Sequence, residues 1–375
     1  MKISILCSDV SDNAVGRADL LARLLAPLAE VEVVGPRHGR EIWSPVAGAA
    51  VSYRSIPGRR MPGFALGMPA LARMADGDLL YASKPRLGSA GVGYAARALS
   101  GRPLLLDIDD WEMGFFLRGG AWGIPGRALN LGNPKGLPWT WLMERLAPLA
   151  HGVTVASRFL QRRFGGTLLP HVRDTDAWRP AKADPGPARR RLGIERERVV
   201  MFLGTPREHK GISDLGAAVR QLGRADVVLA VVGADPASAL ARRLAAECPL
   251  ARLAGPIPFG EVPGFLAAAD VVAIPQRDTS DTRGQVPAKL FDAMALGRPI
   301  VSTRVSMIGE ILEGCGLLVP PGDSGALAEG IGWLLDHRPE ALRLGERARA
   351  RCVERYSFAA AREVLFPLVT RVLRR

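Results

Sequence analysis

Short apolar runs alternate with helical segments along this chain, and no other feature restricts its fold as much. In the first half, leucines with helical spacing occupy residues 20–28, directly before the second apolar run. The apolar runs of that half lie at residues 3–7, 31–35, 78–82, 103–108 and 152–156. Short apolar runs separated by helices are typical of a parallel sheet that helices cover on both faces.

The second half repeats this order. Its apolar runs lie at residues 199–204, 227–232, 271–274 and 300–303, with helical segments at 213–222, 236–247 and 263–269. A length of 375 residues suits two domains. We therefore predict an α/β fold with two doubly wound, Rossmann-like domains that face each other across a cleft. Ligands of such sheets bind at the carboxyl ends of the strands, near the switch point.

Prolines, glycine and charged residues cluster between residues 170 and 187, where we expect the domain boundary. The predicted domains are residues 1–175 and 176–357. The last segment, 358–375, is basic and amphipathic, and we expect a helix there that packs back toward the first domain.

The formal net charge is +13, and arginine supplies nearly all of the positive charge because the chain has only six lysines. This balance favours an anionic partner such as nucleotide phosphates or a membrane surface. Nucleic acid is not expected, since aromatic and basic residues do not alternate and no zinc spacing appears. No apolar run reaches the ~18 residues of a transmembrane helix, and the N-terminus lacks the pattern of a signal peptide. The four cysteines lie far apart in the sequence, which suits a reducing compartment. We therefore predict a cytoplasmic protein, either free or at the inner face of the membrane.

Residues 287–303 predict a helix followed by a buried strand. Pro287 stands where a helix begins and Gly297 where it ends. Lys289 is unexpected, because a cation in the first turn opposes the helix macrodipole at a cost of about 0.3–1 kcal/mol. A phosphate bound at the helix N-terminus would offset this cost. The alternative is a surface ion pair between Lys289 and Asp292, three residues apart.

A second basic cluster lies in the glycine-flanked loop 204–211, directly after a predicted strand. The planar guanidinium of Arg207 and the ammonium of Lys210 both suit a diphosphate. Thr205 and His209 of the same loop are further candidates for contact with that ligand. The alternative is a pair of solvated charges at a loop tip.

Two segments of the first half point to a second ligand. The acidic run 107–112 ends a predicted strand, and a carboxylate there, with Asp110 as the candidate, could orient or deprotonate a hydroxyl group. The alternative is that Asp109 or Asp110 caps a helix starting near Trp111. The aromatic, glycine-rich excursion 115–141 suits contact with an acceptor or a membrane interface. Its alternative is a small aromatic core under a long loop.

Several pieces together resemble the retaining glycosyltransferases of family 4 (glycosyl transferases group 1), which have the GT-B architecture. No single segment is specific for this family, but the order and spacing of the segments together are. The matching pieces are the linker 171–180, residues 190–194 leading into the strand and loop 199–211, the run 268–275, and the stretch 287–303. The first domain would then take the acceptor and the second the nucleotide sugar.

The resemblance implies roles for individual residues. Arg207 and Lys210 would hold the donor diphosphate and stabilise the leaving nucleotide. Asp292 stands where the second glutamate of the family's Glu-x7-Glu motif binds the ribose. Ile257, within 255–258, would present backbone groups to the base. Gly16 would bring its backbone N–H close to the diphosphate, which a glycine permits.

One position departs from the family pattern. The first glutamate of the motif would fall at position 284, where this chain has Gly284. Gly284, Gln285 and Val286 would instead present main-chain amides at the start of the helix. Asp281, or Asp278 beside it, could replace the missing carboxylate on the sugar hydroxyls. Glu310 is a lesser candidate for contact with the ribose or the sugar. A further alternative is that the chain, with Gly284 in place of the glutamate, is a specialised or inactive enzyme.

The expected function is therefore transfer of a sugar, with retention, from a nucleotide-diphosphate sugar to a hydroxyl acceptor. Lipid-linked glycan, polysaccharide and small metabolite are all open as acceptors. No cofactor and no metal are expected, since GT-B relatives generally need none. Two alternatives stay open: a nucleotide-sugar epimerase of the same architecture, and a non-catalytic nucleotide-sugar-binding protein. A nicotinamide dehydrogenase is not expected, because neither half shows a Gly-x-Gly-x-x-Gly turn.

Overall fold

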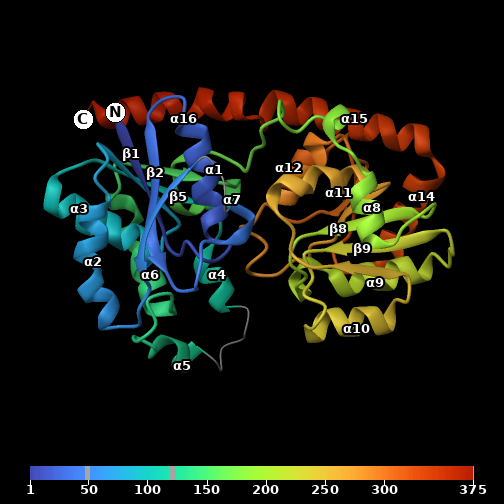
Figure 1. Ribbon diagram of the computed structural model, residues 1–375, viewed down its shortest axis with the longest axis horizontal. Coiled ribbons are helices and arrows are strands. Elements are labelled where there is room, and N and C mark those ends of the chain that lie inside the picture. The colour runs from blue at the N-terminus through green and yellow to red at the C-terminus, as the bar shows by residue number, and fades with distance from the viewer. Residues whose placement is uncertain (47–50, 118–123, 375) are drawn as a thin grey trace. The chain divides into compact units, whose positions relative to one another are not determined.

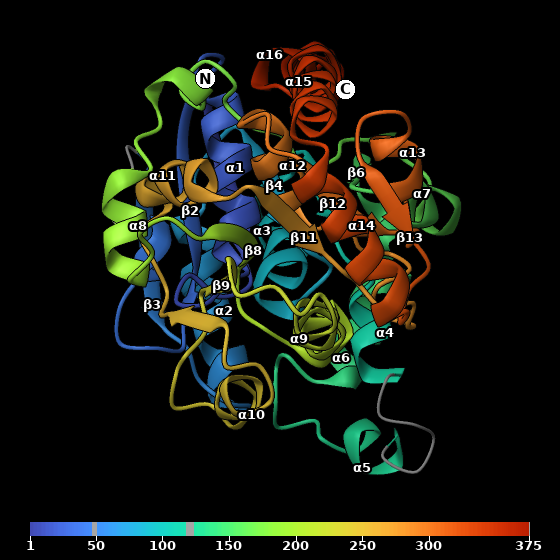
Figure 2. The same ribbon diagram turned by 90° about the vertical axis from the view of Figure 1, so that its right-hand side faces the viewer.

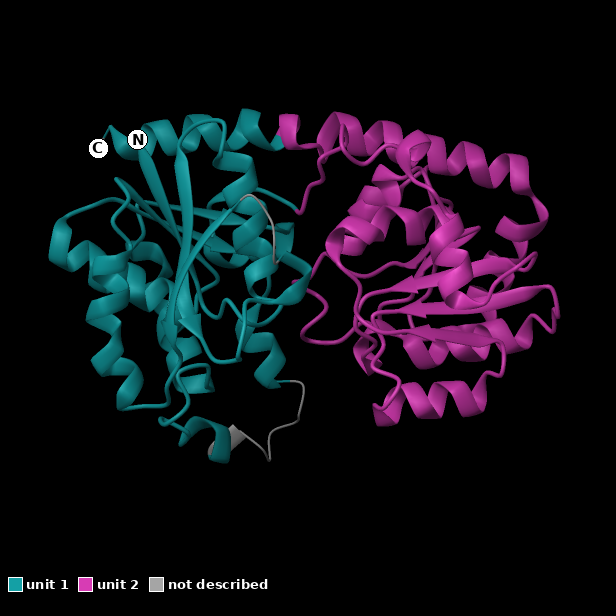
Figure 3. Ribbon diagram, viewed as in Figure 1, with its two compact units in different colours: residues 1–170, 361–375 teal, residues 171–360 magenta. Residues whose placement is uncertain are grey.

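The computed structural model describes residues 1–46, 51–117 and 124–374. The chain forms two compact units, unit 1 with Met1–Pro170 and Ala361–Arg375, and unit 2 with His171–Ala360 (Figure 3). The first boundary thus lies five residues before the predicted one, and the chain returns to unit 1 three residues after the predicted start of the last segment.

Unit 1 contains a seven-stranded parallel sheet in the order β3-β2-β1-β4-β5-β6-β7. Its strands are β1 Lys2–Cys7, β2 Glu30–Arg37, β3 Ser52–Pro57, β4 Leu79–Ser83, β5 Leu104–Ile108, β6 Gly152–Val155 and β7 Thr167–Leu168. Its helices are α1 Val15–Leu25, α2 Gly63–Met74, α3 Val92–Ser100, α4 Glu112–Leu117, α5 Ile124–Ala128, α6 Leu137–Leu146 and α7 Arg158–Phe164 (Figure 1). Strands β4 and β5 are buried at every position, as expected of inner strands covered on both faces.

Unit 2 contains a six-stranded parallel sheet in the order β10-β9-β8-β11-β12-β13. Its strands are β8 Arg198–Leu203, β9 Val227–Val232, β10 Ala251–Ala254, β11 Val271–Ile274, β12 Ile300–Thr303 and β13 Leu317–Val319. The helices that begin in this unit are α8 Gly186–Leu192, α9 Ile212–Gln221, α10 Ala239–Glu247, α11 Val262–Ala268, α12 Ala288–Ala295, α13 Ile308–Leu312, α14 Ser324–Asp336, α15 Arg338–Arg355 and α16 Phe358–Leu373. Figure 2 shows β11, β12 and β13 following one another across this sheet.

Both sheets have the strand order of a doubly wound fold. In each, the chain builds outward in one direction from the first strand and then resumes on the other side of it. The switch points therefore lie between β1 and β4 and between β8 and β11. The predicted α/β architecture is confirmed, with each apolar run of the sequence falling on a strand of one of the two sheets.

The C-terminal helix belongs mostly to unit 1. The Arg362 guanidinium of α16 donates to the backbone carbonyl oxygens of Leu24 (3.1 Å) and Arg23 (3.3 Å) at the end of α1. Arginine at a helix C-terminus satisfies carbonyls that have no intrahelical partner. The excursion 115–141 contains short helices, as expected, although Trp122 lies outside the described residues. All four cysteines are buried and free. Among the described residues, no helix is both long and apolar enough to cross a membrane.

Candidate functional site

The loops that follow β8 and β11 meet at the switch point of unit 2. Gly211 ends the β8 loop with φ of +70°, and a Cβ there would overlap the carbonyl oxygen of Pro275 at the start of the β11 loop. The Arg277 amide donates to the His209 carbonyl oxygen at 2.9 Å. Because the two backbones touch, position 211 requires glycine both for its conformation and for the close approach.

His209 and Asp281 lie inside this loop pair. Both are buried, with His209 Nδ1 3.7 Å from Asp281 Oδ2, and Asp281 accepts a 2.5 Å hydrogen bond from the Thr279 hydroxyl. Thr282 in turn donates to the Arg277 carbonyl oxygen at 2.6 Å. The side chains of His209 and Asp281, both predicted to contact a donor, are thus buried where the two loops meet.

Lys289 in the first turn of α12 has a buried amine without a hydrogen-bond partner among the described residues. Its stem is partly exposed, but Nζ lies 3.6 Å from the centroid of the Phe202 ring of β8. Burial and the positive charge of Lys210 hold the pKa of this amine well below its usual range, against an opposing effect of Asp292. The first turn of α12 contains no acidic residue. The alternative of a surface ion pair between Lys289 and Asp292 is therefore wrong.

Asp292 is instead paired with Arg173. Arg173 Nε donates to Asp292 Oδ1, and both side chains are buried. The same guanidinium donates to the Val172 carbonyl oxygen at 2.7 Å. Burial raises the pKa of the Asp292 carboxyl, and the charge and hydrogen bond of Arg173 oppose this effect. The predicted contact of Asp292 with a ribose stays a prediction. The sequence did not predict Arg173 as part of the site, since it lies in the linker 171–180. Its apolar neighbour Val172 is the signal in the sequence that favours burial.

The two cations of the β8 loop differ in exposure. The Lys210 amine donates to the Thr205 carbonyl oxygen at 2.9 Å, whereas Arg207 and Thr205 are exposed. Lys210 is close enough to Lys289 to lower the pKa of its amine, so the structure brings these two predicted residues together. The role of Arg207 and Lys210 on a diphosphate stays a prediction.

The start of α12 is one residue later than expected, with Pro287 at the N-cap and the helix beginning at Ala288. Gly297 has φ of +62° just beyond its end, as predicted. Gly284 and Val286 are buried, and the Gln285 amide donates to the Thr282 carbonyl oxygen at 3.0 Å.

The remaining predicted site residues lie outside the contact between the β8 loop, His209 and Asp281. Ile257 is buried in the loop after β10, while Asp278 forms an exposed pair with Arg283. Gly16 and Asp110 belong to unit 1. The Gly16 amide donates to the Asn13 carbonyl oxygen at 3.2 Å, in the first turn of α1.

In unit 1, Lys84 lies within the acidic cluster after β5. Its ammonium is 2.6 Å from Asp109, 2.9 Å from Asp110 and 3.3 Å from Glu112. Burial alone would lower the pKa of Lys84, but the three carboxylates raise it well above its usual range. Burial raises the pKa of Asp109 to about 6, against the charge of Lys84. Carboxylate oxygens of these three residues lie within 4.8 Å of one another, a spacing that suits a cation. The Lys84 ammonium is the cation that lies among them.

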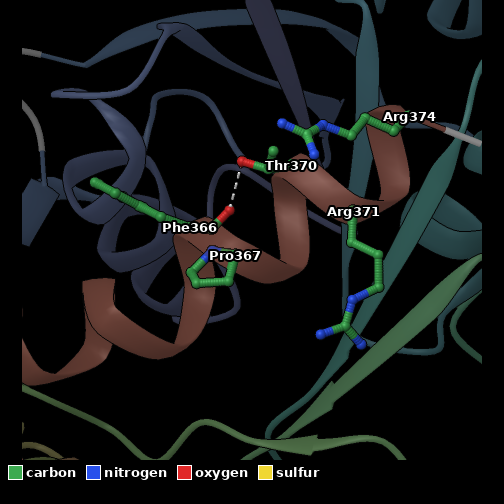
Figure 4. A pocket seen from close by; sticks show the side chains of 5 residues that line it. All are labelled: Phe366, Pro367, Thr370, Arg371 and Arg374. Atoms are coloured by element: carbon green, nitrogen blue, oxygen red, sulfur yellow. Dashed lines mark hydrogen bonds between the residues drawn. The ribbon is translucent and has the colours of Figure 1, made fainter.

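A shallow pocket on α16 contains none of these residues. It is lined by Phe366, Pro367, Thr370, Arg371 and Arg374, and the Thr370 hydroxyl donates to the Phe366 carbonyl oxygen at 2.9 Å (Figure 4).

The whole chain is similar in structure to glycosyltransferases. Anabaena Alr3699/HepE, solved in complex with UDP-glucose, superposes with a TM-score of 0.78 over 99% of both chains at 18% identity. A sucrose-phosphate synthase from Thermosynechococcus elongatus gives 0.73 over 99% of both chains at 20% identity. The fold is GT-B. At these identities, the likeness establishes the GT-B fold alone.

The family model matches one part of the C-terminal half of the chain. Residues 197–337, which include both switch-point loops and α12, match the model of the family described as glycosyl transferases group 1. An MMP alpha-(1->4)-mannosyltransferase of Mycolicibacterium hassiacum is 32% identical over 45% of this chain and 41% of its own length. The putative colanic acid biosynthesis glycosyltransferase WcaL of Escherichia coli is 28% identical over 49% and 54%. This GT-B chain thus matches about half the length of these curated relatives.

Proposed function

We propose that this protein is a glycosyltransferase that moves a sugar from a nucleotide-diphosphate sugar to a hydroxyl acceptor. The observation that carries the proposal is the buried amine of Lys289, which lies near Lys210 without a hydrogen-bond partner. A buried cation without a counter-ion is unfavourable, and an anion bound beside it would remove that penalty. Its position at the start of α12, at the switch point of a doubly wound sheet, suits a phosphate group.

The similar proteins support a nucleotide sugar as the source of this anion. Residues 197–337 contain Lys210 and Lys289 and match glycosyl transferases group 1. Anabaena Alr3699/HepE was solved with UDP and with UDP-glucose. The names of the relatives differ in sugar: one is a mannosyltransferase, and an alpha-D-kanosaminyltransferase of Streptomyces kanamyceticus is 23% identical over 47% of this chain. The donor sugar is therefore left open in the proposal.

The proposed reaction needs only groups of the chain and its substrates. The bond between the anomeric carbon and the diphosphate breaks, a bond to the acceptor oxygen forms, and the acceptor proton passes to the departing diphosphate. Lys210, Lys289 and Arg207 would stabilise the negative charge that develops on that diphosphate, and preorganised charges of this kind lower a barrier effectively. Retention at the anomeric carbon, membership of family 4 and independence from metal ions belong to the proposal. So do a cytoplasmic location and peripheral contact with the membrane.

Two assays test this function. A panel of nucleotide sugars is first screened for the one that raises the melting temperature of the full chain, and that donor is then used to measure transfer. Arg207→Ala and Lys210→Ala should each reduce turnover by on the order of 10²-fold. Arg196→Ala, at an exposed position before β8, is the matched control and should have no effect.

Wild-type turnover in both loop variants would contradict the proposed role of these cations. Incubation with donor alone separates transfer from epimerisation, because an epimerase converts its donor without an acceptor. Conversion of the donor sugar under those conditions would replace the proposed transfer with epimerisation.

A further inference from the structure

The carboxyl end of the unit 1 sheet exposes large apolar side chains from three separate segments. Leu66 of α2 is 78% exposed, Leu129 and Leu131 after α5 are 82% and 57% exposed, and Trp141 of α6 is 49% exposed. Single exposed apolar side chains are ordinary on protein surfaces, but several gathered at one place mark an interaction surface.

Hydrogen bonds hold these three segments together. The Met61 amide, just before α2, donates to the Gly132 carbonyl oxygen at 3.0 Å. The indole N–H of Trp139 in α6 donates to the Leu131 carbonyl oxygen, also at 3.0 Å. The segment with Leu129 and Leu131 therefore lies between the start of α2 and the start of α6. Figures 1 and 2 both show α5 below α2 and α6 in unit 1.

Most charged side chains in these segments are basic. Two of them are already paired, Lys135 with Asp9 and Asp12 and Arg54 with Glu32 and Asp76. Residues 51–75 contain four arginines and no acidic residue, and residues 113–143 contain two arginines, one lysine and no acidic residue. Arg59 and Arg60 are exposed directly before α2, and the Arg59 side chain lies over Gly63 in its first turn. The Arg145 guanidinium lies 5.5 Å from the centre of the Trp141 ring.

We propose that this apolar-basic patch, formed by Leu66, Leu129, Leu131 and Trp141 with Arg59 and Arg60, docks on the surface of an anionic lipid bilayer. Leucine and tryptophan side chains would enter the interface, and the arginines would contact lipid phosphates. The combination favours lipid over a protein partner, because exposed leucines beside the exposed Arg59 and Arg60 match a surface that is both apolar and negatively charged. The patch places the described part of the 115–141 excursion at the membrane, and it does not depend on the proposed sugar transfer.

The test is flotation of the full chain with lipid vesicles of two compositions. Binding is expected to vesicles of phosphatidylcholine mixed with phosphatidylglycerol, and much weaker binding to phosphatidylcholine alone. The double variant Leu129→Ser/Leu131→Ser should weaken binding by about tenfold or more. Its matched control is Leu99→Ser/Leu149→Ser, which removes two leucines that are 67% and 58% exposed outside the patch and should leave binding unchanged.

A second pair of variants separates the patch from the overall positive charge. Arg59→Gln/Arg60→Gln should weaken binding to the anionic vesicles by about tenfold or more, because each arginine close to an anionic surface adds to the affinity through its charge. Arg196→Gln/Arg242→Gln removes the same charge from exposed positions of unit 2 and should have little effect. Equal losses in the two pairs, or no flotation of the wild-type chain with anionic vesicles, would overturn the proposal.

Two further outcomes are informative. If Leu129→Ser/Leu131→Ser turns a dimer into a monomer without changing flotation, the patch is an interface between copies of this chain and the lipid proposal is wrong. Donor binding, measured by calorimetry without vesicles, should be the same in all four double variants. A failure of lipid binding with intact donor binding would therefore contradict the membrane contact and leave the proposed sugar transfer untouched.

Discussion

The amine of Lys289 lies 3.6 Å from the centroid of the Phe202 ring, inside unit 2 and without a hydrogen-bond partner among the described residues. The ring face offers the ammonium a favourable cation–π contact, which does not replace the lost hydration. The residue is therefore expected to reduce stability in the free protein and to favour binding of an anion.

Replacing Lys289 with methionine should stabilise the free protein at neutral pH by about 0.5–2 kcal/mol, the usual gain when a functional strain is removed. The pKa of the Lys289 amine is lowered in the folded state, so the unfolded chain binds more protons below the usual lysine pKa. The wild type therefore gains stability as the pH rises toward the usual lysine pKa, and Lys289→Met lacks this gain. Denaturant unfolding at several pH values measures the difference, which should shrink as the pH rises. A variant less stable than the wild type would count against this reading.

The Arg173–Asp292 pair should contribute far more to stability than an exposed pair. Asp292→Ala leaves the Arg173 guanidinium buried without its counter-ion, at an expected cost of about 3–5 kcal/mol. Asp336→Ala removes one of the two carboxylates paired with Arg224, at a position that is 60% exposed, and should cost about 1 kcal/mol or less because Asp226 stays paired with Arg224. Thermal and urea unfolding of both variants provide the comparison. Similar losses in the free energy of unfolding would contradict the larger contribution expected of the buried pair.

Gly211 gives a test of the contact between the two loops. Gly211→Ala must adopt a positive φ and also overlaps the Pro275 carbonyl oxygen, whereas Gly223→Ala has φ of +61° with no heavy atom within 4 Å. The control substitution should cost about 1–2 kcal/mol from its backbone alone. Gly211→Ala should cost more and should also weaken donor binding. Unfolding and donor titration of the two variants test this prediction. Equal stability and equal donor affinity in the two variants would contradict the contact between the loops.

The acidic cluster of unit 1 predicts a pH effect. Asp109 titrates near pH 6 in the folded chain, above its usual range because of burial, so the folded state binds more protons between about pH 4 and 6. Its contribution to stability is present below that window and is lost as the pH rises through 6. Compared with Asp109→Asn, the wild type should lose up to about 3 kcal/mol from pH 4 to pH 7. A difference that does not change with pH would show that Asp109 does not titrate there.

The inner strands could be predicted from the sequence, and the edge strands could not. The strands that the apolar runs missed are β3, β7, β10 and β13, which are the two edges of each sheet. Strand β3 has no buried residue, and β7 is two residues long and half-buried. An edge strand packs on one side only, so it lacks the continuous apolar run that identifies an inner strand.

The candidate site shows the same division. Lys289 could be predicted as a site residue because its charge opposes the helix dipole, which is a local property of the sequence. The partner of Asp292 is Arg173, 119 residues away, and no local pattern connects them. The burial of His209 and Asp281 likewise depends on two loops meeting, which spacing along the chain does not reveal.

The most direct test of the central claim is calorimetric titration of nucleoside diphosphates into the wild type, Lys289→Met and Lys182→Met. Lys182 is exposed and belongs to the turn Pro180–Lys182, outside the switch-point loops, so its variant removes the same charge from another segment. If the Lys289 amine binds the diphosphate, its loss should weaken binding by about tenfold or more, as expected for a charged hydrogen bond, while Lys182→Met binds like the wild type. Equal affinity in all three proteins would contradict the account.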